Sequence, residues 1–149
     1  MVSCVDSGPQ LRPAQTSDVA GISAIVDAAY QPFRDAGLDL PPVSEGLSED
    51  VETRVVWVAE LDNKLAGVVI LAIDATAHVM NLAVSPDASG QGIGDLLLRH
   101  AVQLAGEAGH RTVHLATHVE MLQTQDFYRK RGWQETGRDG QKLFFARET

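Results

Sequence analysis

Three glycines at alternate positions, directly ahead of a helical pattern, limit most strongly how this chain can fold. The stretch SPDASGQGIGDLLLRHAV covers residues 85–102 and places Gly90, Gly92 and Gly94 before leucines that recur at helical spacing. The first turn of a helix leaves backbone N–H groups unpaired, and the helix dipole adds positive charge there. Because glycine has no side chain, an anion can approach these groups closely. The stretch favours a diphosphate site, with a flexible turn as the alternative.

Two other phosphate-binding motifs do not fit this glycine turn. The chain contains no GxxxxGK followed by Ser or Thr, so a P-loop is excluded. A GxGxxG fingerprint that starts at Gly90 fails because Asp95 occupies its third glycine position. The turn is therefore neither a P-loop nor a Rossmann dinucleotide site.

Hydrophobic periodicity on both sides of the turn predicts alternating strands and helices. A hairpin turn is expected at Asp62 and Asn63, and Pro32 is expected to begin a loop within 31–53 that shapes a substrate mouth. We expect one domain, 1–149, of α/β class, in which helices flank a mixed, mostly antiparallel central sheet. The expected strands are 10–14, 54–61, 64–74, 77–85, 112–119, 133–137 and 142–148, and the expected helices are 19–33, 48–53, 93–108 and 121–131.

Charge and composition exclude several classes of function. The net charge of −8 repels phosphate backbones, which argues against nucleic-acid binding and is compatible with an amine-bearing substrate. The longest apolar run, 65–73, is too short to span a bilayer, so we expect no membrane association and a cytoplasmic location. The single cysteine, Cys4, has no Cys or His nearby at metal-ligand spacing, and no metal is expected.

Two segments in order resemble a known family. The first, NLAVSPDASGQGIGDLLL at 81–98, combines a strand, a proline and a glycine turn that opens a helix, and the second is DFYRKRGW at 126–133. Together they resemble the GNAT superfamily of acyl-CoA-dependent N-acetyltransferases, most strongly over residues 55–137. Two ordered motifs at the right separation are far more specific than either motif alone.

The resemblance implies a coenzyme A site and no metal. Backbone amides from Gly90 to Asp95 would hold the pyrophosphate. The pantetheine arm would lie along the exposed main chain of 82–84, where strands 77–85 and 112–119 splay apart. The cofactor-binding residues implied in this way are Leu82, Ala83, Val84, Ser89, Gly90, Gln91, Gly92, Ile93, Gly94 and Asp95.

Acetyl transfer also needs a proton for the departing thiolate and a donor for the thioester oxygen. By resemblance Tyr128 is the general acid, since a phenol stays protonated near neutrality. The alternative is a core tyrosine on an amphipathic helix, with Phe127 as its buried neighbour. A main-chain amide within 82–84 would stabilise the developing oxyanion.

The base that deprotonates the amine is predicted to be His78, directly or through one water. His78 lies on the strand that leads to the glycine turn, where related enzymes often carry a glutamate, and imidazole titrates near neutrality. His114 and His118 on the facing strand, Glu60 and a main-chain-held water are the alternatives. Each histidine can also be a polar side chain with a purely structural role at the sheet edge.

These features predict an enzyme that moves an acetyl group from acetyl-CoA to a primary amine of a small molecule or peptide. The alternative is a non-catalytic acyl-CoA-binding module. This alternative remains because three positions, Ser89, Met121 and Thr124, differ from the residues that are common in the superfamily. The sequence does not indicate the amine acceptor, and it leaves a homodimer open.

Overall fold

The computed structural model describes residues 8–38 and 46–149, so Cys4 lies outside the described residues. Within them, seven strands form one sheet in the order β1-β2-β3-β4-β5-β7-β6. β4 and β5 are parallel, and the other neighbouring pairs are antiparallel. The predicted fold class is therefore confirmed. The strands are β1 (Gln10–Pro13), β2 (Val55–Leu61), β3 (Lys64–Ile73), β4 (Ala77–Val84), β5 (Thr112–His118), β6 (Gln134–Asp139) and β7 (Lys142–Glu148).

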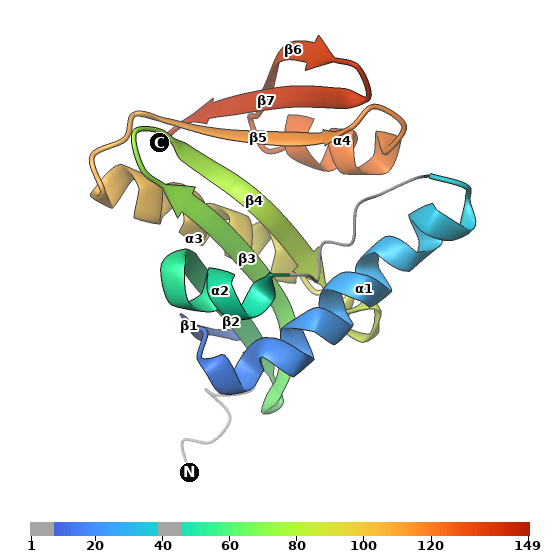
Figure 1. Ribbon diagram of the computed structural model, residues 1–149, viewed down its shortest axis with the longest axis vertical. Coiled ribbons are helices and arrows are strands. Elements are labelled where there is room, and N and C mark those ends of the chain that lie inside the picture. The colour runs from blue at the N-terminus through green and yellow to red at the C-terminus, as the bar shows by residue number, and fades with distance from the viewer. Residues whose placement is uncertain (1–7, 39–45) are drawn as a thin grey trace.

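Helices cover both faces of the sheet (Figure 1). Helices α1 (Val19–Asp35) and α2 (Leu47–Thr53) pack on one face, and α3 (Ile93–Glu107) and α4 (Leu122–Arg129) pack on the other. Each face has its own apolar cluster, with Ile22 and Val26 on the α1 side and Leu97 and Phe145 on the α3 side. Two short 3-10 turns, at Thr16–Asp18 and Pro86–Ala88, lead into α1 and the glycine turn.

Helix α1 continues past Pro32 and ends at Asp35, so the prediction that Pro32 begins a loop is wrong. Proline removes one N–H donor from the helix, but it does not prevent the remaining residues from packing. Ala29 and Phe33 stand one turn apart on the same side of α1, and both line a cavity described below. Residues 39–45 of the expected 31–53 loop lie outside the described residues.

The predicted hairpin between β2 and β3 is present. Asp62 and Asn63 connect the two strands with φ angles of 54° and 66°. Two consecutive residues with positive φ are typical of a type I′ turn, whose twist matches that of the flanking strands. Asp and Asn tolerate this conformation better than most residues do.

Helix α3 packs closely against β3 at Gly67. A Cβ atom at Gly67 would lie 2.8 Å from a methyl carbon of Leu97 and 2.9 Å from one of Ile93. It would also lie 3.1 Å from the carbonyl oxygen of Ala83, which cannot move aside like a side chain. The missing side chain at Gly67 therefore lets the first turns of α3, and with them the glycine turn, lie against the sheet.

Substituting Gly67 should lower stability without removing any contact. We expect Gly67→Ala to lower the free energy of unfolding by about 1–3 kcal/mol, because overpacking must push α3 away from β3. Urea denaturation followed by circular dichroism measures this. The matched control is Gly137→Ala in β6, where an added Cβ meets nothing within 4 Å. Equal unfolding midpoints for the two variants would contradict the close approach.

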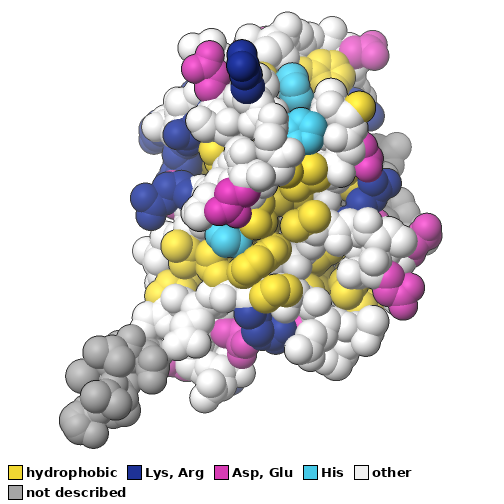
Figure 2. All heavy atoms as spheres, turned by 90° about the vertical axis from the view of Figure 1, so that its left-hand side faces the viewer, with side chains coloured by type: hydrophobic (Ala, Val, Ile, Leu, Met, Phe, Trp, Pro, Cys, Tyr) yellow, Lys and Arg dark blue, Asp and Glu magenta, His cyan; other side chains and the backbone are white. Residues whose placement is uncertain are grey.

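The face on the left of Figure 1 carries a band of apolar side chains, seen in Figure 2. Half-buried hydrophobic residues that pack against the α3-side cluster include Leu11, Val55 and Trp57, and the Trp57 ring stands edge-on to His100 at 4.1 Å between centroids.

A homodimer stays a prediction. Among the described helices, none is long and apolar enough to cross a membrane, and the cytoplasmic location also stays a prediction.

Candidate active site

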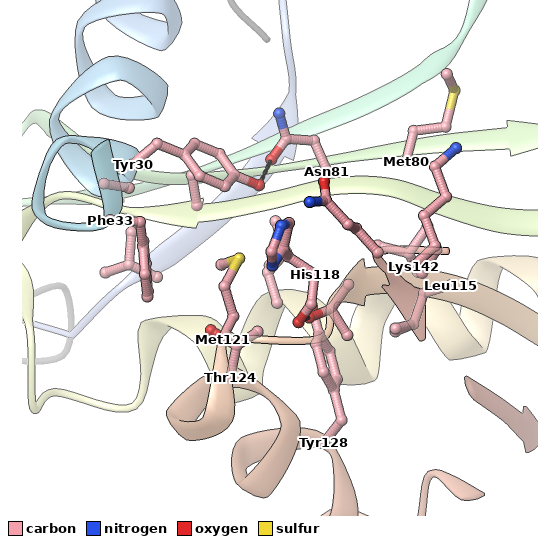
Figure 3. A pocket seen from close by; sticks show the side chains of 18 residues that line it. Tyr30, Phe33, Met80, Asn81, Leu115, His118, Met121, Thr124, Tyr128 and Lys142 are labelled. Carbon is pink, nitrogen blue, oxygen red and sulfur yellow. Dashed lines mark hydrogen bonds between the residues drawn. The ribbon is translucent and has the colours of Figure 1, made fainter. Parts of the chain in front are cut away.

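The parallel strands β4 and β5 separate halfway along their length, as the resemblance implied. Their pairing covers three positions and ends where Val79 meets Leu115. Beyond this point lies a cavity of about 530 Å³ that α1 and α4 help to enclose (Figure 3). The lining includes the main-chain segment predicted to hold pantetheine, 82–84. We call this cavity the cleft, and it is lined by Ala29, Tyr30, Phe33, Val79, Met80, Asn81, Leu82, Ala83, Val84, Leu115, Ala116, Thr117, His118, Met121, Thr124, Tyr128, Gln141 and Lys142.

A β-bulge at Met80 sets which way the cleft residues of β4 face. Pairing with β3 steps from Val79 to Asn81, so Met80 is the extra residue. Strand side chains normally alternate between faces, yet Val79 packs in the α3-side cluster and Ala83 in the α1-side cluster. The bulge therefore turns Asn81 toward α1. Beyond Met80, the side of the β4 main chain that faced β5 has no paired strand.

The glycine turn forms an open N-terminus of α3. Gly90 and Gly92 have φ angles of 79° and 77°, in the left-handed region, and an added Cβ at either one would meet nothing within 4 Å. Gly92 caps α3, and within residues 8–38 and 46–149 no side chain bonds to the free N–H groups of its first turn. Such a turn offers donors and partial positive charge to an anion. The open space beside Gly90 and Gly92 would let a diphosphate approach the free N–H groups.

Asp95, in the first turn of α3, is held away from these donors. Arg131 donates from Nε to one carboxylate oxygen at 2.9 Å, and Arg99 lies 3.3 Å from the other. The Arg131 guanidinium also stacks over the Phe127 ring, at 3.7 Å from its centroid. The pair ties the end of α4 to the start of α3, so the glycine turn and Tyr128 are positioned by one connected set of contacts.

Tyr128 reaches from α4 into the cleft (Figure 3). Its side chain is only 7% exposed and packs against Phe127, Trp133 and Phe145. Within residues 8–38 and 46–149 its hydroxyl has no hydrogen-bond partner, yet it is not among the fully buried polar atoms, so it meets the cleft. Burial raises the pKa of Tyr128, with Tyr30 as a smaller cause, and the hydroxyl therefore stays protonated.

The opposite wall of the cleft joins α1 to β4. The Tyr30 hydroxyl donates to Oδ1 of Asn81 at 3.2 Å, and Asn81 is only 8% exposed. Burial raises the pKa of Tyr30 above its ordinary value, so this hydroxyl also remains a donor. Sequence reasoning did not single out either residue, because their contact depends on where α1 crosses the sheet.

His78, the predicted base, does not line the cleft. It is exposed at the start of β4, bonded to the Thr76 hydroxyl at 2.7 Å, and its ring lies 5.3 Å from that of His114. Burial of the ring and then the nearby His114 lower its pKa. Four residues of extended chain, about 13 Å, separate His78 from Leu82. One water cannot bridge that distance, which argues against His78 as the base.

The other predicted bases also differ in their placement. Glu60 lies outside the cleft and pairs with Arg12. His114 pairs with His78 in the closed part of the sheet. His118, at the end of β5, does line the cleft. Among the described residues that line the cleft there is no Asp or Glu, so no carboxylate from that set can act as the base there.

Comparisons with known proteins agree with this architecture. A family model described as an acetyltransferase (GNAT) domain matches residues 52–135, more than half of the chain. The peptidyl-lysine N-acetyltransferase YjaB of Salmonella typhimurium is 34% identical over 99 residues, 64% of this chain. The matched regions span only 54% and 61% of the length of two curated relatives, from Bacillus subtilis and Salmonella typhimurium.

Solved structures show the same fold at low sequence identity. The PaiA N-acetyltransferase of Thermoplasma acidophilum, solved in complex with coenzyme A, has a TM-score of 0.87 and 18% identity, covering 95% of this chain and 99% of that one. The ribosomal-protein-S18-alanine N-acetyltransferase of Escherichia coli has a TM-score of 0.75 and 20% identity, covering 94% of this chain and 93% of that one.

Proposed function

Because the chain belongs to the GNAT acetyltransferase family, we propose that it moves an acetyl group from acetyl-CoA to a primary amine of a small molecule or peptide. The attack is direct, without an acetylated enzyme residue. We further propose that residues 1–149 act as a single domain. One observation carries the proposal: the opening between β4 and β5 brings the main chain of 82–84 and the hydroxyl of buried Tyr128, which has no hydrogen-bond partner among the described residues, into one cleft.

In this proposal three parts of acetyl-CoA bind to groups of the chain. The free amides of the glycine turn suit the pyrophosphate, and the main chain of 82–84 offers a strand edge to the amide groups of pantetheine. A main-chain amide of the same segment is suited to stabilise charge on the thioester oxygen. Acetyl-CoA supplies the acetyl group as a thioester, whose C–S bond breaks as the amine nitrogen forms the amide bond.

In this proposal Tyr128 donates its proton to the departing sulfur. Burial raises its pKa, which would weaken an acid acting on a thiolate in bulk water. The thiolate would form in the same cleft, however, and the same loss of solvation raises its proton affinity. The two groups therefore remain matched, and proton transfer in the cleft is not opposed by the burial of the phenol.

We assign deprotonation of the amine to water that enters the cleft, in place of His78. No carboxylate lines the described part of the cleft, and His118 has its Nδ1 atom engaged, because it accepts a hydrogen bond from the Glu120 N–H at 3.1 Å. The acceptor must then lose its proton to solvent before or during attack. The rate is governed by the fraction of acceptor that is neutral.

The pH dependence tests this assignment. We expect kcat/KM to rise with pH along a limb whose midpoint follows the pKa of the acceptor, because the neutral amine is the nucleophile. His78→Ala should change kcat/KM by less than about twofold at every pH. Acceptors of different basicity supply the measurement, with His114→Ala as the control. If kcat/KM instead rises with a midpoint below pH 7 that is the same for all acceptors, and this rise disappears in His78→Ala, His78 is the base.

The function itself is tested by amine-dependent release of CoA. Purified protein is mixed with acetyl-CoA and a panel of primary amines, and free thiol is followed over time. Release that requires both an amine and the protein supports the proposed enzyme. Tight acetyl-CoA binding without release on any amine would favour the alternative, a non-catalytic acyl-CoA-binding regulatory module.

A further inference from the structure

A lysine and a histidine stand side by side in the cleft and have no part in the proposed acetyl transfer. Lys142 of β7 and His118 of β5 are direct partners in an antiparallel pair, so both side chains project from the same face about 4.5–5.5 Å apart at Cβ. Both line the cleft. Figure 3 shows the Lys142 side chain extending from β7 toward the β4 side, where Met80 and Asn81 lie.

Contacts around His118 fix which nitrogen of its ring carries the proton. Nδ1 accepts a hydrogen bond from the backbone N–H of Glu120, so the neutral ring holds its proton on Nε2. The backbone carbonyl of His118 is held as well, since Gln125 donates to it from Nε2 at 3.1 Å. Within the described residues Nε2 of His118 has no partner and is not fully buried. His118 therefore presents a preoriented N–H donor.

The ammonium group of Lys142 is free to bind a ligand. Within residues 8–38 and 46–149 it forms no ion pair with a carboxylate, although Asp139 lies opposite it across β6 and β7. The described lining of the cleft contains no Asp or Glu that could neutralise it. A cation and a fixed N–H donor thus meet at one place on a protein whose net charge is −8.

We infer that the amine acceptor also carries a carboxylate, which binds between Lys142 and His118. Two oxygens on one planar group can accept from Nζ and Nε2 together, and charge-assisted hydrogen bonds are the stronger kind. Leu115 of β5 and Leu143 of β7 pack in the α3-side cluster, so His118 and Lys142 project from the α1 side of the sheet, as Asn81 does. A carboxylate held there would direct the amine of the same molecule along the cleft toward the segment 82–84.

This inference rests on the proposed function and names its substrate class. A graded series of unbranched ω-amino acids is compared with the matching primary amides, which have the same shape and no charge. We expect kcat/KM for the best amino acid to exceed that of its amide by about tenfold to a hundredfold, carried mainly by KM. Two short peptides, one with Asp and one with Asn next to the amino terminus, are compared in the same way. Their kcat/KM values show whether a carboxylate on a peptide gives the same preference.

Three variants identify the groups responsible. Lys142→Met should remove the preference for the carboxylate and leave the rate on the amide unchanged, Lys142→Arg should keep the preference, and His118→Phe should reduce it. Lys64→Met is the control, because it removes the same charge from the exposed start of β3. Equal wild-type rates on acids and amides would overturn this inference while the proposed function stands. A protein that acetylates no amine at all would overturn both.

Discussion

Replacing Tyr128 by phenylalanine should lower kcat about 10²-fold to 10⁴-fold and leave the affinity for acetyl-CoA nearly unchanged. The variant keeps the ring that packs against Phe127, Trp133 and Phe145 and removes only the hydroxyl that meets the cleft. The size of the effect is that expected for loss of a general acid. Steady-state kinetics with saturating amine, together with calorimetry for acetyl-CoA, separate the two quantities.

Tyr30→Phe is the matched control for this prediction. It deletes a hydroxyl in the same cleft whose partner is Asn81, so about one hydrogen bond is lost and kcat should fall by less than about tenfold. Burial raises the pKa of Tyr128, so Tyr128 stays protonated up to about pH 10. Wild-type kcat should therefore not fall as the pH is raised to that value. A near-normal kcat in Tyr128→Phe would reduce Tyr128 to a core residue.

Replacing Gly92 by glutamate should weaken acetyl-CoA binding by about a hundredfold or more. The new side chain would occupy the open space above the first turn of α3, and its carboxylate would take the place of the pyrophosphate. Loss of two charge-assisted hydrogen bonds at about 1.5 kcal/mol each gives this magnitude. Calorimetric titration with acetyl-CoA is the measurement.

The control for Gly92→Glu must reproduce its backbone strain. Gly46 also caps a helix, has a φ of 80°, and leaves open space around an added Cβ, so Gly46→Glu carries the same conformational cost and the same added charge. It should bind acetyl-CoA like the wild type. Unchanged affinity in a folded Gly92→Glu variant would remove the glycine turn from the cofactor site.

The fold could be predicted because local patterns and global structure agree in this chain. Strand β7 was predicted with the observed bounds, and the turn at Asp62 and Asn63 has the residues that a type I′ hairpin prefers. Helix α1 was predicted too short, since Pro32 is a strong local stop signal, yet the helix continues to Asp35. The glycine turn could be predicted because its backbone conformation favours glycine at particular positions, as the φ angles of 79° and 77° at Gly90 and Gly92 show.

The cleft wall opposite Tyr128 could not be predicted in the same way. The pairing of His118 with Lys142 depends on the register of β5 against β7, and the contact of Tyr30 with Asn81 depends on a bulge at Met80. No short turn joins β5 to β7, so turn residues cannot indicate their register, and the position of the bulge in β4 is not marked by any residue type. His78 lies outside the cleft because it precedes the point where β4 and β5 separate, and the sequence does not show where along β4 that point falls.

The most direct test of acetyl transfer follows an isotopic label. Purified protein is mixed with acetyl-CoA labelled in the acetyl carbonyl and an excess of a primary amine, and the products are identified by mass spectrometry. We expect the label to appear in an amide of the acceptor, in equal amount to the CoA released. Label that remains in the thioester, or that appears as free acetate, would contradict it.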